Sequence, residues 1–267
     1  MDFAGKTIWI TGASSGIGRG LAEAFSGQGA HIILSGRREG ALAEVADACA
    51  GETLVLPFEA TAYDALPAIV ETAEDWKGGV DILVNNAGIS QRSVALDTDF
   101  EVYRRLMEVD FFAPLKLTQL LLPRMVERGI GHFVQISSVA GKVGSPLRTG
   151  YCAAKHALTG YSDALRAEID QFGLEVTVVT PGFVQTGIAE NALDGSGQRY
   201  GPNDDPVNQG ISPAAAAEQI LSAMKAGKRE VPVGRRGAPE MALLTLKRLF
   251  PNMIFDRMTA MAPKRGG

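Results

Sequence analysis

The sequence predicts a single α/β domain with a doubly wound parallel sheet over residues 1–234, followed by an extension of residues 235–267. Apolar runs of strand length alternate along the chain with longer segments of helical period. A parallel sheet needs such helical crossovers on both of its faces. With 267 residues, 46% of them hydrophobic and 21% charged, the chain is long enough to bury a substantial core.

The expected strands are short and rich in β-branched residues. They lie at Lys6–Thr11, His31–Ser35, Thr53–Pro57, Val80–Asn85, His132–Ser137 and Glu175–Thr180, with a last short strand at Glu230–Val233. The helical periods between them cover Ile17–Gln28, Gly40–Ala50, Tyr63–Lys77, Phe100–Arg128 and Tyr151–Phe172. Pro114 should kink or divide the fourth helix, because proline removes a donor and clashes with the preceding turn.

The regular alternation lapses after Thr186. Residues 187–210 hold five Gly and two Pro among many Asn and Asp, which is too polar for a core and too long for a simple connection. Ser212 and Pro213 then predict the start of another helix. We expect residues 187–228 to cover a substrate.

Composition excludes several classes of function. The net charge of −4 gives no global attraction for nucleic acid. Cys49 and Cys152 form no Cys-x-x-Cys pair, and three scattered histidines predict no metal site. No stretch approaches a membrane span, and residues 1–7 enter a strand without a charged and apolar leader, so we expect a cytoplasmic location.

A glycine-rich turn joins the first strand to the first helix, with the sequence Thr11-Gly12-Ala13-Ser14-Ser15-Gly16-Ile17-Gly18. Its glycines allow the backbone to approach a pyrophosphate, and the helix N-terminus offers free N–H groups and a partial positive charge. A plain glycine turn is the alternative, which the position after the first strand disfavours. We expect Gly12, Ser14, Ser15, Gly16, Ile17 and Gly18 to bind a dinucleotide.

The second strand ends in Ser35-Gly36-Arg37-Arg38, where an NAD enzyme of this architecture needs a carboxylate for the ribose 2′-hydroxyl. Two guanidinium groups and no carboxylate favour a 2′-phosphate instead. Arg37 and Arg38 therefore predict NADP(H) as the cofactor. The alternative is a pair of solvated surface arginines.

Polar side chains follow the fourth and fifth strands, at the edge of the sheet where a cofactor would bind. Asn85-Asn86-Ala87-Gly88 ends the fourth strand, and Ser137-Ser138 ends the fifth. Tyr151 and Lys155 lie at i and i+4 on the next helix, close enough for the ammonium to act on the phenol. A Tyr-x-x-x-Lys alone is a weak signal, but Ser138 thirteen positions upstream strengthens it.

With these motifs the chain resembles the short-chain dehydrogenase/reductase family to about residue 234. The resemblance rests on the glycine loop, Asn86-Ala87-Gly88, Ser138, Tyr151, Lys155 and the Pro181-Gly182-Phe183-Val184-Gln185-Thr186 segment. It implies a Rossmann-type fold, with Tyr151 as the acid/base and Ser138 binding the substrate oxygen. Lys155 would lower the pKa of Tyr151 and hold the nicotinamide ribose. Pro181 and Gly182 would line the cofactor site, and Val184 and Thr186 would face the carboxamide.

Two positions depart from the family pattern. Asp110 stands where the family usually has an Asn that holds a relay water, so we expect it either to raise the pKa of Tyr151 or to serve as a relay carboxylate. Glu59 stands where an Asp near the adenine is common, and its longer side chain puts that contact in doubt.

The extension is basic and amphipathic. Residues 235–267 carry seven Lys or Arg and two acids, a net charge of +5, which leaves −9 on residues 1–234. Leucines and phenylalanines at 243, 244, 246, 249, 250 and 255 interleave with these bases, as in a helix that lies on a membrane surface. We expect instead a helix packed over the cleft or against a subunit partner, because the family generally forms homodimers or homotetramers.

These features predict an NADP(H)-dependent oxidoreductase that interconverts a carbonyl and a secondary alcohol. Val94, Val143, Leu147, Phe183 and Ile188 predict a lipophilic substrate. One alternative is a 3-oxoacyl reductase that acts on acyl-carrier-protein substrates and needs a basic docking patch. The other is a nonenzymatic dinucleotide sensor, which has no need for Ser138, Tyr151 and Lys155 together.

Overall fold

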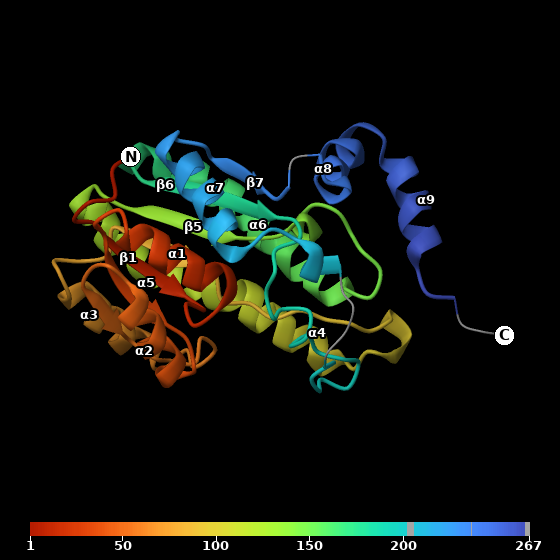
Figure 1. The fold of residues 1–267 in the computed structure, drawn as a ribbon, viewed down its shortest axis with the longest axis horizontal. Helices are drawn as coiled ribbons and strands as arrows, with labels where there is room; N and C mark the ends of the chain where they lie inside the picture. The colour runs from red at the N-terminus through yellow and green to blue at the C-terminus, as the bar shows by residue number, and fades with distance from the viewer. Residues whose placement is uncertain (202–205, 236, 265–267) are drawn as a thin grey trace.

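The computed structural model describes residues 1–201, 206–235 and 237–264, and these form a seven-stranded parallel sheet flanked by helices (Figure 1). The strands are β1 (Thr7–Thr11), β2 (His31–Ser35), β3 (Thr53–Val55), β4 (Ile82–Asn85), β5 (His132–Ile136), β6 (Glu175–Pro181) and β7 (Glu230–Val233). Their order across the sheet is β3-β2-β1-β4-β5-β6-β7. The predicted doubly wound, single-domain α/β fold is confirmed.

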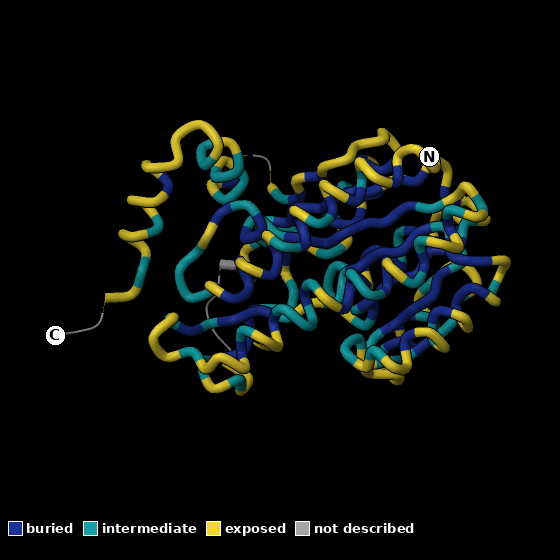
Figure 2. Tube along the Cα trace, turned by 180° about the vertical axis from the view of Figure 1, so that it is seen from behind, coloured by how far each residue is buried: buried dark blue, intermediate teal, exposed yellow. Residues whose placement is uncertain are grey.

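Nine helices lie in the described residues. They are α1 (Gly16–Ser26), α2 (Glu39–Ala48), α3 (Leu66–Asp75), α4 (Phe100–Met107), α5 (Ala113–Arg128), α6 (Thr149–Ile169), α7 (Pro213–Lys225), α8 (Pro239–Leu249) and α9 (Pro251–Met261). Within those residues, the helices are all too short or too polar to cross a bilayer. The strands are mostly dark blue at the centre of the molecule in Figure 2, whereas α8 and α9 stand beyond the carboxyl ends of the strands.

The core has one part on each face of the sheet, because successive strand residues point to opposite sides. On β1, Ile8 and Ile10 face the side covered by α1, α2 and α7, whereas Trp9 faces the side covered by α3, α5 and α6. All three side chains are fully buried. This double coverage accounts for the nearly continuous apolar strands in the sequence.

The long helical stretch before β5 is divided, as Pro114 predicts. A π-helical segment, Glu108–Phe112, separates α4 from α5, and Pro114 occupies the first turn of α5 where no helical donor is required. Such π-helical turns are rare and frequently lie at functional sites. This one carries Asp110, which is completely buried.

The segment 187–228 splits into two parts, with residues 202–205 outside the described residues. Its first part runs beside the loop after β4, where the backbone of Leu193 bonds Ser90 and Arg92. Its second part forms α7, which packs on α1 so closely that a Cβ on Gly20 would lie 2.7 Å from the Pro213 carbonyl oxygen. The first part and Val207 therefore lie near the carboxyl edge of the sheet, whereas α7 packs on α1.

Candidate active site

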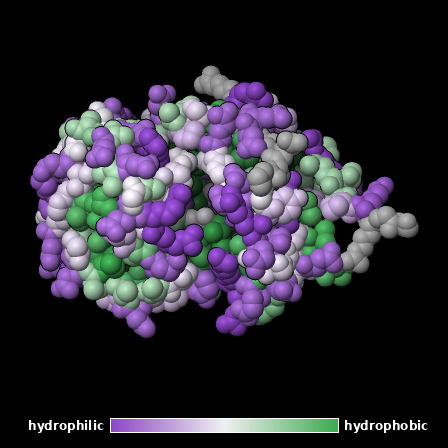
Figure 3. Space-filling model, turned by 60° about the horizontal axis from the view of Figure 1, so that its bottom comes forward, coloured by the Kyte–Doolittle hydropathy of each residue, from purple (hydrophilic) through white to green (hydrophobic). Residues whose placement is uncertain are grey.

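A cavity of about 1410 Å³ opens at the carboxyl edge of the sheet, beside the point where the strand order reverses between β1 and β4. Figure 3 looks onto a hollowed face, with hydrophobic side chains at the bottom of the recess and hydrophilic ones around it. Every predicted site residue except Gly18 and Asp110 lines the cavity. The lining members are Gly12, Ser14, Ser15, Gly16, Ile17, Arg37, Arg38, Glu59, Asn86, Ala87, Gly88, Ser138, Tyr151, Lys155, Pro181, Gly182, Val184 and Thr186.

The glycine turn forms a cradle that larger residues would fill. Gly12 and Gly16 both have left-handed backbone angles, with φ of +64° and +55°. A Cβ on Gly12 would lie 2.8 Å from the Cα of Ala87, and one on Gly16 would lie 2.9 Å from Thr186. Since α1 begins at Gly16, its free N–H groups face the same space. The cradle fits the pyrophosphate of a dinucleotide.

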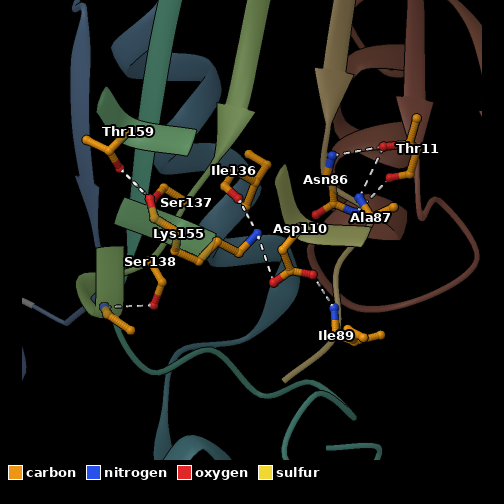
Figure 4. A network of polar contacts seen from close by, with 11 residues as sticks. Thr11, Asn86, Ala87, Ile89, Asp110, Ile136, Ser137, Ser138, Lys155 and Thr159 are labelled. Carbon is orange, nitrogen blue, oxygen red and sulfur yellow. Dashed lines mark hydrogen bonds and ion pairs between the residues drawn. The ribbon is translucent and has the colours of Figure 1, made fainter. Parts of the chain in front are cut away.

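Gly18 has a packing role. A Cβ at this position would lie 2.3 Å from the carbonyl oxygen of Gly12, so the absence of a side chain lets α1 pack against the glycine turn. Asn86 joins the turn to β4, because its Nδ2 donates to the carbonyl oxygens of Thr11 and Gly12 at 2.9 and 3.1 Å. The Thr11 hydroxyl accepts from the backbone N–H groups of Asn86 and Ala87 (Figure 4).

The two arginines after β2 both reach the cavity, with different partners. Arg38 Nη2 donates to the Ser14 hydroxyl at 3.1 Å, and Arg37 Nη1 lies 3.7 Å from Glu59 Oε2. The Arg37 and Glu59 side chains are about half exposed or more, at 66% and 46%. Glu59 thus lines the cavity as an ion-pair partner of Arg37.

Tyr151 and Lys155 lie in the first turns of α6, and Ser138 lies at the end of β5. Tyr151 is 6% exposed and Lys155 is 4% exposed. The Lys155 ammonium donates to the Ile136 carbonyl oxygen at 3.0 Å (Figure 4). It lies 5.9 Å from the centre of the Tyr151 ring. All three residues line the cavity.

Burial raises the pKa of Tyr151 in the protein without cofactor, and the Asp110 carboxylate adds to the rise. The Lys155 ammonium, contact with the Ser138 hydroxyl and the Arg148 charge all oppose it. Lys155 therefore acts on the Tyr151 pKa in the predicted direction, while burial of the phenol acts in the opposite direction and is the larger effect.

Asp110 lies directly behind the cavity wall. Its Oδ1 accepts from the Ile89 backbone N–H at 2.8 Å, and its Oδ2 lies 3.7 Å from Lys155 Nζ. Burial raises the pKa of Asp110, opposed by the Lys155 ammonium and the Ile89 hydrogen bond. Gly88 leaves room for the pair, since a Cβ there would lie 3.3 Å from Asp110 Oδ1 and 3.4 Å from Lys155 Nζ.

The structure adds residues that sequence reasoning missed. Gln91 is fully buried and its Oε1 accepts from the Gly150 backbone N–H at 2.7 Å, directly before Tyr151. No motif marks this glutamine, which follows the Asn-Ala-Gly segment as an ordinary loop residue. The extension also reaches the cavity through Pro239, Glu240, Leu243, Arg257, Met258 and Met261.

Three of the five apolar residues that predict a lipophilic substrate line the cavity. Val143, Phe183 and Ile188 line the cavity. Val94 and Leu147 are not among the described lining residues. The Val94 carbonyl accepts from the Asp97 N–H within its own turn, and the Leu147 carbonyl accepts from the Ser93 N–H.

The glycine cradle and the Tyr151–Lys155 pair beside it define a dinucleotide-dependent oxidoreductase of the doubly wound α/β class. A sequence profile described as short chain dehydrogenase matches residues 6–196. The chain belongs to the short-chain dehydrogenase/reductase family. Among its relatives is "Dehydrogenase/reductase SDR family member 7B" of Danio rerio, 39% identical over 271 residues, which cover 98% of this chain and 87% of that protein.

Solved structures share the fold. A short-chain dehydrogenase from Burkholderia cenocepacia in complex with NADP superposes with a TM-score of 0.80 at 24% identity, covering 97% of this chain and 99% of that one. A short-chain dehydrogenase/reductase from Burkholderia phymatum in complex with NAD gives 0.81 at 23% identity and covers both chains fully, at 100% each. At these identities the likeness concerns the fold alone.

Proposed function

We propose that the protein is an NADP(H)-dependent oxidoreductase that interconverts a lipophilic carbonyl compound and its secondary alcohol. The observation that carries the proposal is that Ser138, Tyr151 and Lys155 line the same cavity as the glycine cradle. NADP(H) is favoured over NAD(H) because Arg37 and Arg38 both reach the cavity at the end of β2.

Some residues of the cavity bind the cofactor, and others transfer the proton. The N–H groups at the start of α1 would hold the pyrophosphate, and Lys155 would hold the nicotinamide ribose. NADPH supplies the hydride when bound. The Tyr151 hydroxyl donates a proton to the carbonyl oxygen of the substrate, and the Ser138 hydroxyl donates a hydrogen bond to the same oxygen.

Lys155 also stabilises the phenolate that remains on Tyr151 after proton transfer. Its ammonium is held by the Ile136 carbonyl and faces the Asp110 carboxylate, so its position is fixed on two sides. Because the site is buried, these charges interact more strongly than they would in water. The same residues run the reverse reaction, in which Tyr151 accepts the proton of the alcohol.

A 3-oxoacyl reductase that acts on acyl-carrier-protein substrates is the second candidate. Its support is a set of basic side chains at the cavity: Arg104 and Arg105 of α4 and Arg257 of α9 are exposed and line it. Such a rim fits an acidic carrier protein. A nonenzymatic dinucleotide sensor has less support, because binding alone does not need the Ser138, Tyr151 and Lys155 arrangement.

The test is the consumption of NADPH and NADH, followed by absorbance, with a panel of ketones and 3-oxoacyl thioesters presented free and on an acyl carrier protein. The proposal expects turnover with lipophilic ketones and a preference for NADPH. Turnover confined to carrier-bound thioesters would favour the second candidate, and none with any carbonyl would favour the sensor. The cytoplasmic location and the homodimeric or homotetrameric state remain predictions, to be checked by cell fractionation and light scattering.

A further inference from the structure

The two C-terminal helices form a hairpin that contributes little to the core. In α8, all of whose residues the structure describes, no side chain is buried, and in α9 only Ile254 is, with 1% exposure. Figures 1 and 2 show both helices outside the sheet and its covering layers. A helix that packs on its own protein buries a continuous apolar stripe. This hairpin therefore leaves apolar side chains without a partner in the described chain.

The exposed apolar side chains gather where the two helices meet. Leu249, Phe250 and Met253, which we call the hairpin tip, are 61%, 57% and 49% exposed. Single exposed apolar residues are ordinary on protein surfaces, but adjacent large ones mark an interaction surface. None of the three lines the cavity, so catalysis gives no reason for their exposure.

Basic residues flank this tip in the sequence. Lys247 and Arg248 directly precede it, Arg257 and Lys264 follow in and after α9, and Arg236 and Arg265 lie outside the described residues. The Lys247 ammonium lies 3.6 Å from the centre of the Phe255 ring, which is itself 52% exposed. Such long basic side chains keep their charge in water while their stems cover apolar surface.

The charge distribution of the chain favours a negatively charged partner for the hairpin tip. The extension is positive while residues 1–234 carry a net charge of −9, so the tip with its neighbours Lys247 and Arg248 suits a negative surface. Two tips paired with each other would bring Lys247 and Arg248 of both copies together, which like-charge repulsion disfavours. An anionic phospholipid surface offers negative headgroups to the bases and hydrocarbon to the tip.

We propose that the hairpin tip docks on an anionic phospholipid membrane and holds the cavity mouth close to the bilayer. The other side of the hairpin lines the cavity with Leu243, Met258 and Met261, so the same two helices join the membrane surface to the substrate site. This step rests on the proposed function: the substrate would be a carbonyl compound that partitions into the bilayer.

The test is cosedimentation of the full chain with vesicles of phosphatidylcholine alone and with phosphatidylserine added, in the absence of cofactor and substrate. We expect binding to the phosphatidylserine vesicles only. Raising the salt from about 0.1 M to about 1 M shortens the screening length from about 10 Å to about 3 Å and should weaken binding. Absence of binding, or binding that is indifferent to both phosphatidylserine and salt, would overturn the proposal.

Two sets of variants distinguish binding through the hairpin tip from nonspecific adsorption of exposed apolar side chains to vesicles. Replacing Leu249, Phe250 and Met253 together by Ser should weaken vesicle binding at least about tenfold, since burying one such side chain already exceeds that free energy. The matched control replaces Leu96 and Phe100 by Ser. These side chains are 80% and 72% exposed but lie outside the hairpin, so vesicle binding should be unchanged. Equal loss in both sets, or in neither, would contradict the proposal.

Light scattering on the triple variant tests whether the hairpin tip binds a second copy of the chain instead of a membrane. A fall in molecular mass with unchanged vesicle binding would assign the tip to a second copy and overturn the proposal. Thermal unfolding checks that the variant is folded. Because vesicle binding is measured without turnover, failure of the membrane proposal leaves the proposed reaction intact, and failure of the reaction leaves vesicle binding measurable.

Discussion

Lys155 and Asp110 form a buried ion pair in which Nζ and Oδ2 lie 3.7 Å apart. Within the described residues Oδ2 has no hydrogen-bond partner, so this pair is the main compensation for the buried carboxylate. The same carboxylate raises the pKa of Tyr151, while the Lys155 ammonium lowers it. The Asp110 carboxylate therefore acts electrostatically on both Tyr151 and Lys155, although Asp110 does not line the cavity.

The first prediction is that Asp110→Asn lowers the pKa of Tyr151 by removing a negative charge that disfavours phenolate. Alcohol oxidation requires the phenolate, so its rise in kcat/KM with pH should move to lower pH, by about one pH unit if the lost interaction is about 1.4 kcal/mol. The matched control is Asp163→Asn, an exposed carboxylate on the same helix as Tyr151. An unchanged profile, or one moved to higher pH, would contradict this role.

The second prediction assigns a positioning role to Gln91. Gln91→Met removes the acceptor for the Gly150 N–H, which would leave a buried donor unpaired at the turn that carries Tyr151. We expect kcat to fall about tenfold, because small displacements of catalytic groups are costly, with the dissociation constant of NADPH unchanged. Gln119→Met, at an exposed position on α5, is the control. Equal losses of cofactor binding and turnover would indicate general damage instead.

The third prediction concerns cofactor choice. Arg37→Ala and Arg38→Ala should each raise the KM for NADPH about ten- to hundredfold, because a hydrogen bond to a charged group contributes about 1.5–3 kcal/mol. The KM for NADH should change little, as it lacks the 2′-phosphate. Steady-state kinetics with both cofactors provide the measurement, with Arg19→Ala on the exposed face of α1 as the control. A wild type that prefers NADH would show that the two arginines are solvated surface residues.

The fourth prediction concerns stability. Burial lowers the pKa of His132 to about 4, and its Nε2 bonds the Thr177 hydroxyl at 2.8 Å. In the unfolded chain the His132 imidazole binds a proton near pH 6.5, whereas in the folded protein it does so only near pH 4. The neutral imidazole therefore contributes fully to the free energy of unfolding above pH 6.5, and about 3 kcal/mol of that free energy is lost as the pH falls toward 4. Urea unfolding at a series of pH values should show this decline, and His132→Gln should flatten it. Equal slopes in both proteins would assign the acid sensitivity to other groups.

The order of strands and helices can be predicted from the sequence, because hydrophobic periodicity and glycine positions determine local backbone structure. The strand–glycine turn–helix order around Gly12 and Gly16 predicts the cradle, and the i, i+4 spacing predicts that Tyr151 and Lys155 share a face. The Gln91–Gly150 bond could not be predicted, because it joins segments 59 residues apart through loop geometry. Burial of the Tyr151 phenol, which raises its pKa, is likewise a tertiary effect that the i, i+4 spacing does not reveal.

The most direct test of the proposed function is turnover of NADPH with a ketone substrate by Tyr151→Phe, alongside cofactor binding measured by fluorescence. The variant loses only the transferable proton, so NADPH affinity should stay within about twofold while kcat falls about 10²- to 10⁴-fold. Lys155→Ala should differ by weakening NADPH binding as well. A Tyr151→Phe enzyme that keeps most of its turnover would contradict the assignment of Tyr151 as the proton donor.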